Sequence, residues 1–176
     1  MILEGLSLIK LELETELLPF NCDDTELNGF FFDDAKDYLE GLLAKTYILH
    51  NDLETVAYWN YLNDKISYND LGNEEKWIER VVTTLTNRKK LKSYPAVKIG
   101  RLAVNSKYKG KGIGKMIVDY TKEIFLDNNK TGCKFITVDA FIESLEFYEK
   151  QDFVFLSGKD KRSDTRLMYY NLASLK

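Results

Sequence analysis

The chain has 176 residues, of which 44% are hydrophobic, 13% aromatic and 30% charged, with only two prolines. This composition excludes a disordered or collagen-like chain, because such chains lack the apolar surface that offsets the entropy lost on folding. The formal net charge is −3, and at roughly 100 to 200 residues per domain the length predicts a single domain over residues 1–176.

Signals for a membrane span, an export leader and a metal site are weak. The longest apolar stretches, such as Phe30–Phe32, are far shorter than the roughly 20 residues that cross a bilayer. Glu4 interrupts the apolar start of the chain. We therefore expect a cytoplasmic protein without a membrane partner. Cys22, Cys133 and His50 are too few and too scattered for a zinc site or a disulfide framework, so no metal is expected.

Charge is distributed unevenly along the chain. Up to Leu85 the acidic residues far outnumber the basic ones, whereas Thr86–Lys115 contains ten basic residues and no acidic residue. Such a block is usually a solvated face, but it also attracts polyanions. The basic residues of this block are Arg88, Lys89, Lys90, Lys92, Lys98, Arg101, Lys107, Lys109, Lys111 and Lys115.

The chain is expected to open with a strand and a helix. Apolar residues recur within Leu6–Leu13 and suggest the strand. Asp23–Thr25 offer caps for a helix that runs to about Leu43. Its apolar face would be formed by Phe30, Ala35, Leu39 and Leu42.

A hairpin and a second helix are predicted next. Two β-rich runs, Thr46–Leu49 and Thr55–Leu62, are separated by the polar turn Asn51–Asp52. A helix then opens at Asn73–Glu74 and continues to Leu85.

The second half alternates strands and helices. Ala96–Val104 is predicted as a strand that follows Pro95. A bulge is expected beside Gly100, because the apolar residues change there from odd-numbered to even-numbered positions. After a turn at Asn105–Lys109, a helix carries Ile113, Ile117, Tyr120 and Ile124 on one face and ends near Asn128, Asn129 and Gly132. The remaining elements are a strand Phe135–Ala140, a helix Glu143–Lys150 and strands Phe153–Leu156 and Leu167–Asn171, which together predict an α/β (α+β) fold with a mixed sheet.

The segment Lys109–Lys115 reads K-G-K-G-I-G-K and lies between a predicted strand and an amphipathic helix. Glycines let the backbone approach an anion, while unpaired amides and the positive end of the helix dipole point at it. Lys109, Lys111 and Lys115 add point charges. The segment therefore predicts a phosphate-binding loop.

Two common phosphate motifs do not fit the spacing. A nucleoside-triphosphate P-loop needs four residues between its glycines and a hydroxyl residue after the lysine, whereas Gly110 and Gly114 enclose three residues and Met116 follows Lys115. A dinucleotide fingerprint needs G-x-G-x-x-G in the first strand-helix unit of a domain. The glycines of this segment give G-x-G-x-G instead. The P-loop is rejected, and the dinucleotide fingerprint fits poorly.

The segment resembles the signature of the GNAT family of N-acetyltransferases. Lys109-x-x-Gly112-x-Gly114 is similar to the family's [R/Q]-x-x-G-x-[G/A], with lysine as a departure at the first position. Phe147–Phe153 reads F-Y-E-K-Q-D-F and resembles the family's F-Y-E-K-x-G-F, with Asp152 in place of glycine. The resemblance covers Pro95–Asn171 and extends to the first ninety residues only through the order of elements. It implies a GNAT fold with a central mixed, mostly antiparallel sheet flanked by helices.

The resemblance also implies an acyltransferase that moves an acetyl group from acetyl-coenzyme A to a primary amine by direct attack. Main-chain groups of the central strand would pair with the pantetheine arm, and the glycine loop would hold the pyrophosphate. Tyr148 would protonate the departing thiolate, because a phenol with a pKa near 10 stays protonated until the sulfur gains charge. The implied cofactor-binding residues are Leu102, Ala103, Val104, Lys109, Gly110, Lys111, Gly112, Ile113, Gly114 and Lys115.

The acceptor stays open at this point. The acidic first half suits a cationic amine such as a polyamine. Phe20–Cys22, Leu27–Phe30 and Ile99–Val104 resemble segments of bacterial toxins that acetylate aminoacyl-tRNA, and Arg88–Lys115 would then bind phosphates of tRNA. The acidic net charge speaks against an RNA substrate. A non-catalytic coenzyme A-binding module is a third alternative.

The sequence singles out neither a general base nor an oligomeric state. Asp139 and Glu143 are candidate bases near the end of a predicted strand. Tyr58, Trp59 and Tyr61 are expected to pack within the hairpin, with an interface or a wall of the acceptor pocket as alternatives, so a homodimer stays open.

Overall fold

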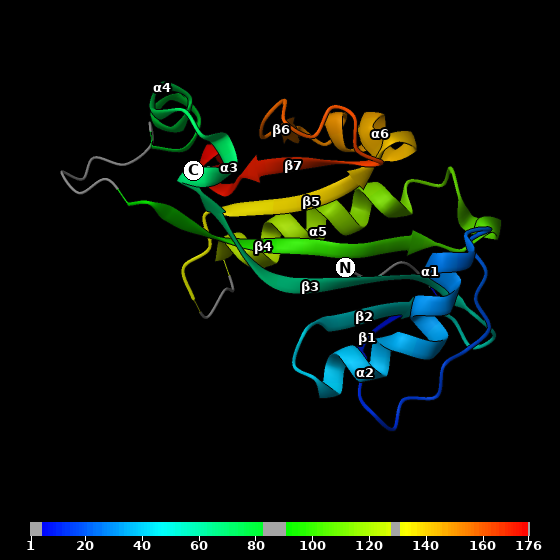
Figure 1. Cartoon of the computed structure of the whole chain (residues 1–176). Helices are drawn as coiled ribbons and strands as arrows, with labels where there is room; N and C mark the ends of the chain where they lie inside the picture. The colour runs from blue at the N-terminus through cyan, green and yellow to red at the C-terminus, as the bar shows by residue number, and fades with distance from the viewer. Residues whose placement is uncertain (1–4, 83–90, 128–130, 176) are drawn as a thin grey trace. The chain divides into compact units, whose positions relative to one another are not determined.

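Seven strands in the order β1-β2-β3-β4-β5-β7-β6 form the sheet (Figure 1). The computed structural model describes residues 5–82, 91–127 and 131–175. β4 (Ser93–Val104) and β5 (Phe135–Phe141) are parallel, whereas the other strand pairs with a defined register are antiparallel. The expected α/β (α+β) fold with a mixed, mostly antiparallel sheet flanked by helices is confirmed.

The chain divides into two units, each made of two segments. The first unit comprises Met1–Leu62 and Ile99–Thr121, and the second comprises Asn63–Lys98 and Lys122–Lys176. β4 and β3 (Thr55–Ser67) contribute residues to both units. The single domain over residues 1–176 stays a prediction.

The predicted hairpin is present in the first unit. β1 (Ser7–Lys10) pairs with β2 (Lys45–His50), and β2 pairs with β3, both in antiparallel register. The turn is held by Asn51, whose Oδ1 accepts hydrogen bonds from the amides of Leu53 and Glu54, each at 2.9 Å. Side chains of the asparagine type commonly organise a turn in this way.

The predicted first helix is present as one helical stretch with a π-helical centre. It consists of α1 (Thr25–Gly29), a π-helical turn (Phe30–Asp34) and α2 (Ala35–Glu40). Asp24 caps it by accepting the amide of Leu27 at 2.9 Å. The expectation that Leu42 lies on the apolar face is wrong, because Leu42 follows the helix end with a φ of +57° and is 82% exposed.

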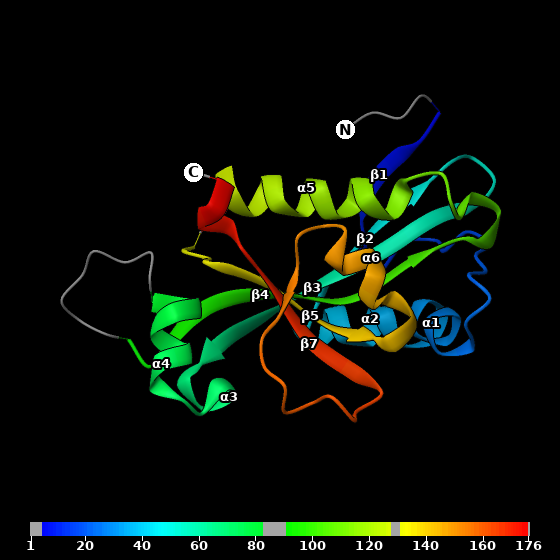
Figure 2. The ribbon, with the colours of Figure 1, turned by 90° about the horizontal axis from the view of Figure 1, so that it is seen from above.

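Helices cover both faces of the strands in the first unit (Figure 2). Tyr58 of β3 packs on Phe31 at a ring-centroid distance of 4.9 Å, on the side of α1 and α2. The ring centroid of its neighbour Trp59 lies 6.2 Å from that of Tyr120 in α5 (Ile113–Asp127). Successive residues of a strand point to opposite faces, so the two helical layers lie on opposite sides. Tyr58, Trp59 and Tyr61 are all buried, which confirms core packing for these aromatics.

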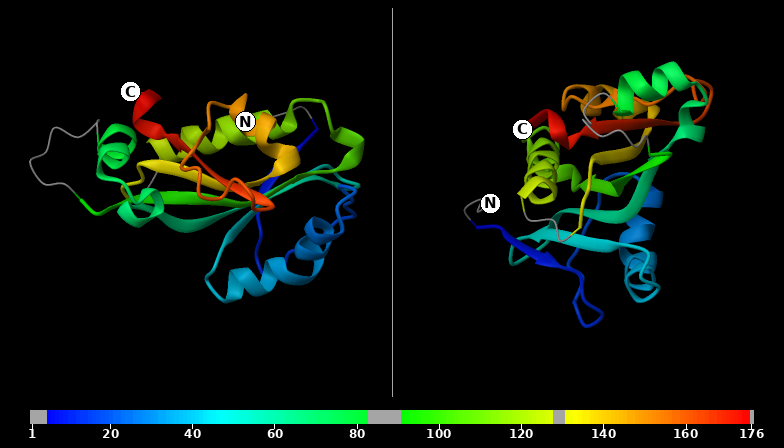
Figure 3. Two further views of the ribbon diagram at one scale, coloured as in Figure 1. Left: turned by 45° about the horizontal axis from the view of Figure 1, so that its top comes forward. Right: turned by 90° about the vertical axis from the view of Figure 1, so that its left-hand side faces the viewer.

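In the second unit, β7 (Thr165–Asn171) pairs antiparallel with β5 and with the short strand β6 (Val154–Phe155). Figure 3 shows β6 and its connection to β7 in orange. The predicted final strands are thus confirmed, although β6 is shorter than expected. The helix expected over Glu143–Lys150 is present as α6 (Leu145–Glu149), preceded by a 3₁₀ turn.

The helical stretch before β4 is more divided than predicted. Asn73 caps α4 (Glu74–Trp77) as expected, accepting the amide of Lys76 at 3.0 Å, and a π-helical turn over Ile78–Val82 follows. The separate short helix α3 (Tyr68–Leu71) was not predicted. The expected helix ends at Leu85 and at Asn128 and Asn129 lie outside the described residues.

Replacing Phe31 by alanine is expected to lower the free energy of unfolding by about 3 to 5 kcal/mol, because it opens a cavity among packed rings. Phe31 is fully buried, whereas its neighbour Phe32 is 44% exposed. Phe32→Ala is therefore the matched control, with an expected loss below about 1 kcal/mol. Urea denaturation of the three proteins measures both values, and equal losses would contradict the assigned core.

Candidate functional site

The glycine-rich segment lies between β4 and α5. β4 ends at Val104, a 3₁₀ turn covers Ser106–Tyr108, and α5 begins at Ile113. Gly110 and Gly112 have φ angles of +75° and +79°, in the left-handed region where other side chains are strained. An added Cβ would meet no atom within 4 Å at either position. Glycine is therefore required for backbone conformation and not for space.

The main chain of this segment leaves several amides unpaired. The amides of Lys109 and Lys111 donate to the carbonyls of Ser106 and Tyr108 at 3.3 and 3.4 Å. The amide of Met116 then donates to the carbonyl that precedes α5, at 3.0 Å. Because the first amides of a helix have no carbonyl one turn earlier, they suit a bound anion, which the helix dipole also favours. Within this fully described segment, the amides without a partner are those of Gly110, Gly112, Ile113, Gly114 and Lys115.

The lysines of the segment contact the protein itself. The ammonium group of Lys109 donates to the carbonyl of Cys22 at 2.6 Å, and that of Lys115 lies 2.5 Å from Asp119. Lys111 packs over an aromatic ring, with its Nζ 4.8 Å from the ring centroid. The main-chain amides are therefore the freest donors of the segment.

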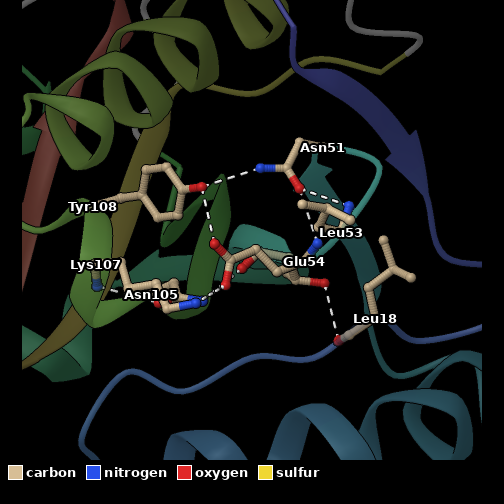
Figure 4. Close-up of polar contacts among 8 residues, drawn as sticks. Leu18, Asn51, Leu53, Glu54, Asn105, Lys107 and Tyr108 are labelled. Carbon is tan, nitrogen blue, oxygen red and sulfur yellow. Dashed lines mark hydrogen bonds and ion pairs between the residues drawn. The ribbon is translucent and has the colours of Figure 1, made fainter.

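Asn105 anchors the start of the segment to β3 (Figure 4). Its amide donates to the carbonyl of Val56 at 2.9 Å, and its side-chain amide donates to the carbonyl of Thr55 at 3.0 Å. Its Oδ1 accepts the amide of Lys107 at 3.2 Å. Asn105 is 3% exposed, so water competes little for these bonds. The residue that follows β4 is thus fixed by the backbone of the neighbouring strand.

Glu54 provides a second anchor from the turn between β2 and β3 (Figure 4). The ammonium group of Lys107 lies 2.5 Å from its carboxylate, and the hydroxyl of Tyr108 donates to Oε1 at 3.1 Å. Asn51 in turn donates to the Tyr108 hydroxyl at 3.1 Å. The hydrogen bond and charge of Lys107 hold the pKa of Glu54 below its ordinary value of 4.5, and Glu54 raises the pKa of Lys107. Glu54 therefore stays ionised at neutral pH.

Side chains of β3 lie close to the backbone of β4 at Gly100. A Cβ at Gly100 would collide with the side chains of Leu62 and Asn60. The amide of Arg101 donates to the side-chain Oδ1 of Asn60 at 2.8 Å. This arrangement agrees with the bulge expected from the shift in apolar parity.

Tyr148 lies in α6 with its ring buried at 6% exposure. The ring packs against Phe147 and Phe153 at centroid distances of 4.9 and 5.4 Å. Burial raises the pKa of Tyr148 above its ordinary value of 10, because the phenolate would lose its solvation. The hydroxyl has no hydrogen-bond partner among the described residues. Some unpaired polar side-chain atoms are fully buried, but the Tyr148 hydroxyl is not one of them. The phenol is therefore neutral and free to donate.

Asp152 occupies the place of the glycine in F-Y-E-K-x-G-F and has a φ of +63°. Its amide donates to the carbonyl of Glu149 at 3.0 Å, and the amide of Phe153 donates to the carbonyl of Tyr148 at 3.1 Å. The turn after α6 thus needs a left-handed residue, which glycine adopts freely and aspartate tolerates.

The cations of the basic block mostly have carboxylate partners. Of the ten, the three at 88–90 lie outside the described residues, and five of the others lie within 4.0 Å of a carboxylate. Their charges are therefore partly neutralised inside the fold. The pairs are Lys98 with Asp64 and Asp139, Arg101 with Glu26, Lys107 with Glu54, Lys109 with Asp23, and Lys115 with Asp119.

Neither candidate base is distinguished by its surroundings. Oδ2 of Asp139 accepts the ammonium group of Lys98 at 2.7 Å. Glu143 lies exposed in the 3₁₀ turn before α6. The general base therefore stays unassigned.

The sequence did not single out Glu54, Asn60 or Asn105 as functional residues. Asn105 was placed only in a turn, although it bonds the backbone of Thr55, 50 residues earlier. Asn60 bonds the amide of Arg101, 41 residues later. Patterns of local spacing carry no signal for such pairs.

Within residues 5–82, 91–127 and 131–175, no group of three or more His, Cys, Asp or Glu side chains is arranged to hold a metal ion. Both cysteines are free thiols, and burial raises the pKa of each. None of the helices in the same residues has the length and apolar character needed to cross a membrane.

A family model described as an acetyltransferase (GNAT) domain matches residues 79–172, which is more than half of the chain. The chain belongs to the GNAT acetyltransferase family. It is an acyltransferase that uses acetyl-coenzyme A as the acetyl donor. The expectations of family, enzyme class and cosubstrate are confirmed.

Solved structures with the same fold include acetyltransferase toxins. A structure of AtaT complexed with acetyl-methionyl-tRNAfMet has a TM-score of 0.77 at 18% identity and covers 97% of this chain and 96% of that chain. A KacT variant with one tyrosine changed to phenylalanine has a TM-score of 0.75 at 18% identity, covering 98% of each chain. AtaTR bound with acetyl-coenzyme A has a TM-score of 0.77 at 19% identity, covering 97% and 96%. At these identities the likeness establishes the fold.

Replacing Glu54 by glutamine should lower the midpoint of thermal unfolding at pH 7, because the ion pair that holds residue 107 is lost. The pKa of Glu54 is depressed in the folded state, so its contribution is present above the ordinary pKa of 4.5 and is lost as the pH falls through the folded pKa. The wild-type protein and Glu54→Gln should therefore converge in acid.

Asp52→Asn, in the same turn, is the matched control. Asp52 is exposed and has no ion pair with another described residue. We expect its unfolding curve to follow that of the wild type at every pH. A difference between wild type and Glu54→Gln that persists undiminished at pH 3 would contradict the role given to the Glu54 carboxylate.

Proposed function

We propose that the amides of Gly110–Lys115 bind the pyrophosphate of acetyl-coenzyme A, that Tyr148 is the general acid, and that the acceptor is the amino group of an aminoacyl-tRNA. The unpaired amides of the anchored glycine segment are the observation that carries the cofactor site. The acceptor is the narrower part of the proposal and has a test of its own.

The amides suit a diphosphate because they are already held in place. Asn105 and Glu54 fix the start of the segment, and α5 fixes its end. Donors that need no reorganisation bind an anion at low entropic cost. Lys111 adds a positive charge with no carboxylate partner among the described residues.

The central strand offers main-chain groups to the pantetheine arm. β4 pairs with β5 from Ala96–Phe135 to Lys98–Thr137, and β4 then continues to Val104. Leu102, Ala103 and Val104 therefore supply the groups that an arm lying like an added strand would use. The amide of Arg101 is taken by Asn60, and successive amides of a strand point to opposite edges. The amide of Leu102 is thus the candidate to polarise the thioester carbonyl.

Tyr148 is suited to protonate the leaving thiolate. In the proposed step the neutral amine forms a bond to the carbonyl carbon, the carbon–sulfur bond breaks, and the phenolic proton passes to the sulfur. The proton lost by the amine leaves to solvent, from which the phenolate is reprotonated. Because burial raises the pKa of Tyr148, the phenol is fully protonated at neutral pH and keeps its proton available until the sulfur gains charge.

Two observations favour aminoacyl-tRNA over a small cationic amine. Asp23, Glu26 and Glu54 of the acidic first half pair with cations of the chain, so their charges are not free to attract a polyamine. Among the structural relatives, AtaT is complexed with acetyl-methionyl-tRNAfMet. AtaT is also bound to the C-terminus of the antitoxin AtaR, so an antitoxin partner would accompany this function. A homodimer stays a prediction.

Turnover of acetyl-coenzyme A against a panel of acceptors tests the proposed substrate. The panel contains aminoacyl-tRNAs, unacylated tRNA, spermidine, an aminoglycoside and a lysine peptide. We expect kcat/KM for at least one aminoacyl-tRNA to exceed that for every other acceptor by on the order of 100-fold. Faster acetylation of spermidine would overturn the proposed acceptor and leave the cofactor site untouched.

Tyr148→Phe removes the acid while keeping the buried ring. We expect kcat to fall by about 100-fold or more and the affinity for acetyl-coenzyme A, measured by calorimetry, to stay unchanged. Tyr170→Phe is a control for removing a hydroxyl from a buried tyrosine of the same unit. An unchanged kcat in Tyr148→Phe would show that Tyr148 is not the acid.

A further inference from the structure

A groove of about 900 Å³ in the second unit is lined by cations from two separate parts of the sequence. One part is the helical stretch of α3 and α4 with the π-helical turn that follows, and the other is β6 with its connection to β7. None of the described residues that line the groove is a carboxylate. The cations are Lys76, Arg80, Lys159, Lys161 and Arg166.

Two of these cations are oriented by main-chain carbonyls, which leave the positive charge in place. Nη1 of Arg80 donates to the carbonyls of Phe155 and Leu156 at 3.2 and 2.9 Å. The ammonium group of Lys159 donates to the carbonyl of Asn69 at 2.9 Å. A cation held in this way is preorganised for an anion without being neutralised by an acid.

Arg166 is the one lining cation that has a carboxylate within 4 Å among the described residues. Its Nε donates to Asp160 at 2.9 Å, and its guanidinium lies 4.4 Å from the ring centroid of Phe155. The other oxygen of Asp160 accepts the amide of Leu167 at 2.6 Å, so this acid is committed to two partners. Within the described residues, Lys76 and Lys161 are exposed and have no carboxylate within that distance.

We propose that this groove binds the sugar-phosphate backbone of the tRNA substrate. The proposal rests on the proposed function and adds a docking site to it. The volume exceeds what a single phosphate needs, and several fixed cations without an opposing acid suit a chain of phosphates. The basic block at Thr86–Lys115, by contrast, has most of its described cations paired with carboxylates.

An acidic peptide fits the groove less well. A peptide would gain most by adding a strand to β6, which is the last strand in the sheet order. Arg80 already occupies the carbonyls of Phe155 and Leu156 at this strand. A phosphate backbone needs only charge and donors, and these are what the groove offers.

The double variant Lys76→Ala/Lys161→Ala tests the proposal, because the ammonium group of neither lysine makes a hydrogen bond to another described residue. We expect its Kd for purified unacylated tRNA, in about 0.1 M salt, to rise by about tenfold. The slope of log Kd against log salt should fall in magnitude by about 1.5 to 2, as for the loss of two phosphate contacts. Calorimetry should give an unchanged affinity for acetyl-coenzyme A.

Lys45→Ala/Lys65→Ala is the matched control, since it removes two exposed lysines outside the groove and changes the net charge equally. We expect its Kd for tRNA to stay within about twofold of the wild type. If both double variants lost tRNA affinity equally, the loss would be an effect of net charge alone, and the proposal would be overturned.

The outcomes separate the groove from the proposed function. If the groove variant acetylates aminoacyl-tRNA and binds tRNA as the wild type does, the groove is overturned and the proposed function stands. If the groove variant loses tRNA affinity while the acceptor panel shows no acetylation of aminoacyl-tRNA, the groove is supported and the proposed acceptor fails. If the variant loses affinity for polyglutamate but not for tRNA, the occupant is an acidic peptide and the proposal is overturned.

Discussion

A set of unpaired amides binds an anion well only when the segment that carries them is held by other contacts. In this acetyltransferase those contacts come from the hairpin that precedes the segment by about 50 residues in sequence: Asn105 bonds the backbone of β3, and Glu54 holds Lys107 and Tyr108. The glycines at 110 and 112 then turn the chain so that α5 begins with its first amides unpaired. The proposed cofactor site therefore depends on the N-terminal half as much as on the signature itself.

The uneven charge of the sequence has a simple structural meaning in the first unit. Acids from the early part of the chain, among them Asp23, Glu26 and Glu54, are the partners of cations that follow in the basic block. Part of the uneven charge distribution along the sequence is thus balanced by ion pairs within the folded protein. Among the described residues, cations without such partners include Lys92 and Lys111 inside the block and Lys76 and Lys161 outside it. Charge runs in the sequence therefore located only part of the free positive charge.

Most of the secondary structure could be predicted, because periodicity, caps and turn residues act locally. The hairpin, the cap at Asp24 and the strand–glycine–helix order around residue 110 follow from such signals. The failures arise where the outcome depends on distant contacts or on backbone detail. Leu42 fits a helical spacing, but the chain has already turned out of the helix there. Likewise Asn60 and Glu54 are ordinary polar residues until the fold brings Arg101 and Lys107 beside them.

Gly110 and Gly112 also separate two constraints that usually occur together, namely a left-handed backbone and a lack of space for a side chain. At residue 112 a methyl group would have room, and only the chirality of an L-amino acid opposes it. Because a D-amino acid prefers a positive φ, D-alanine introduced at this residue by chemical ligation would match the backbone conformation and reduce the freedom of the unfolded chain. Chirality at a single α-carbon, and not the volume of a side chain, is thus what this part of the acetyltransferase selects.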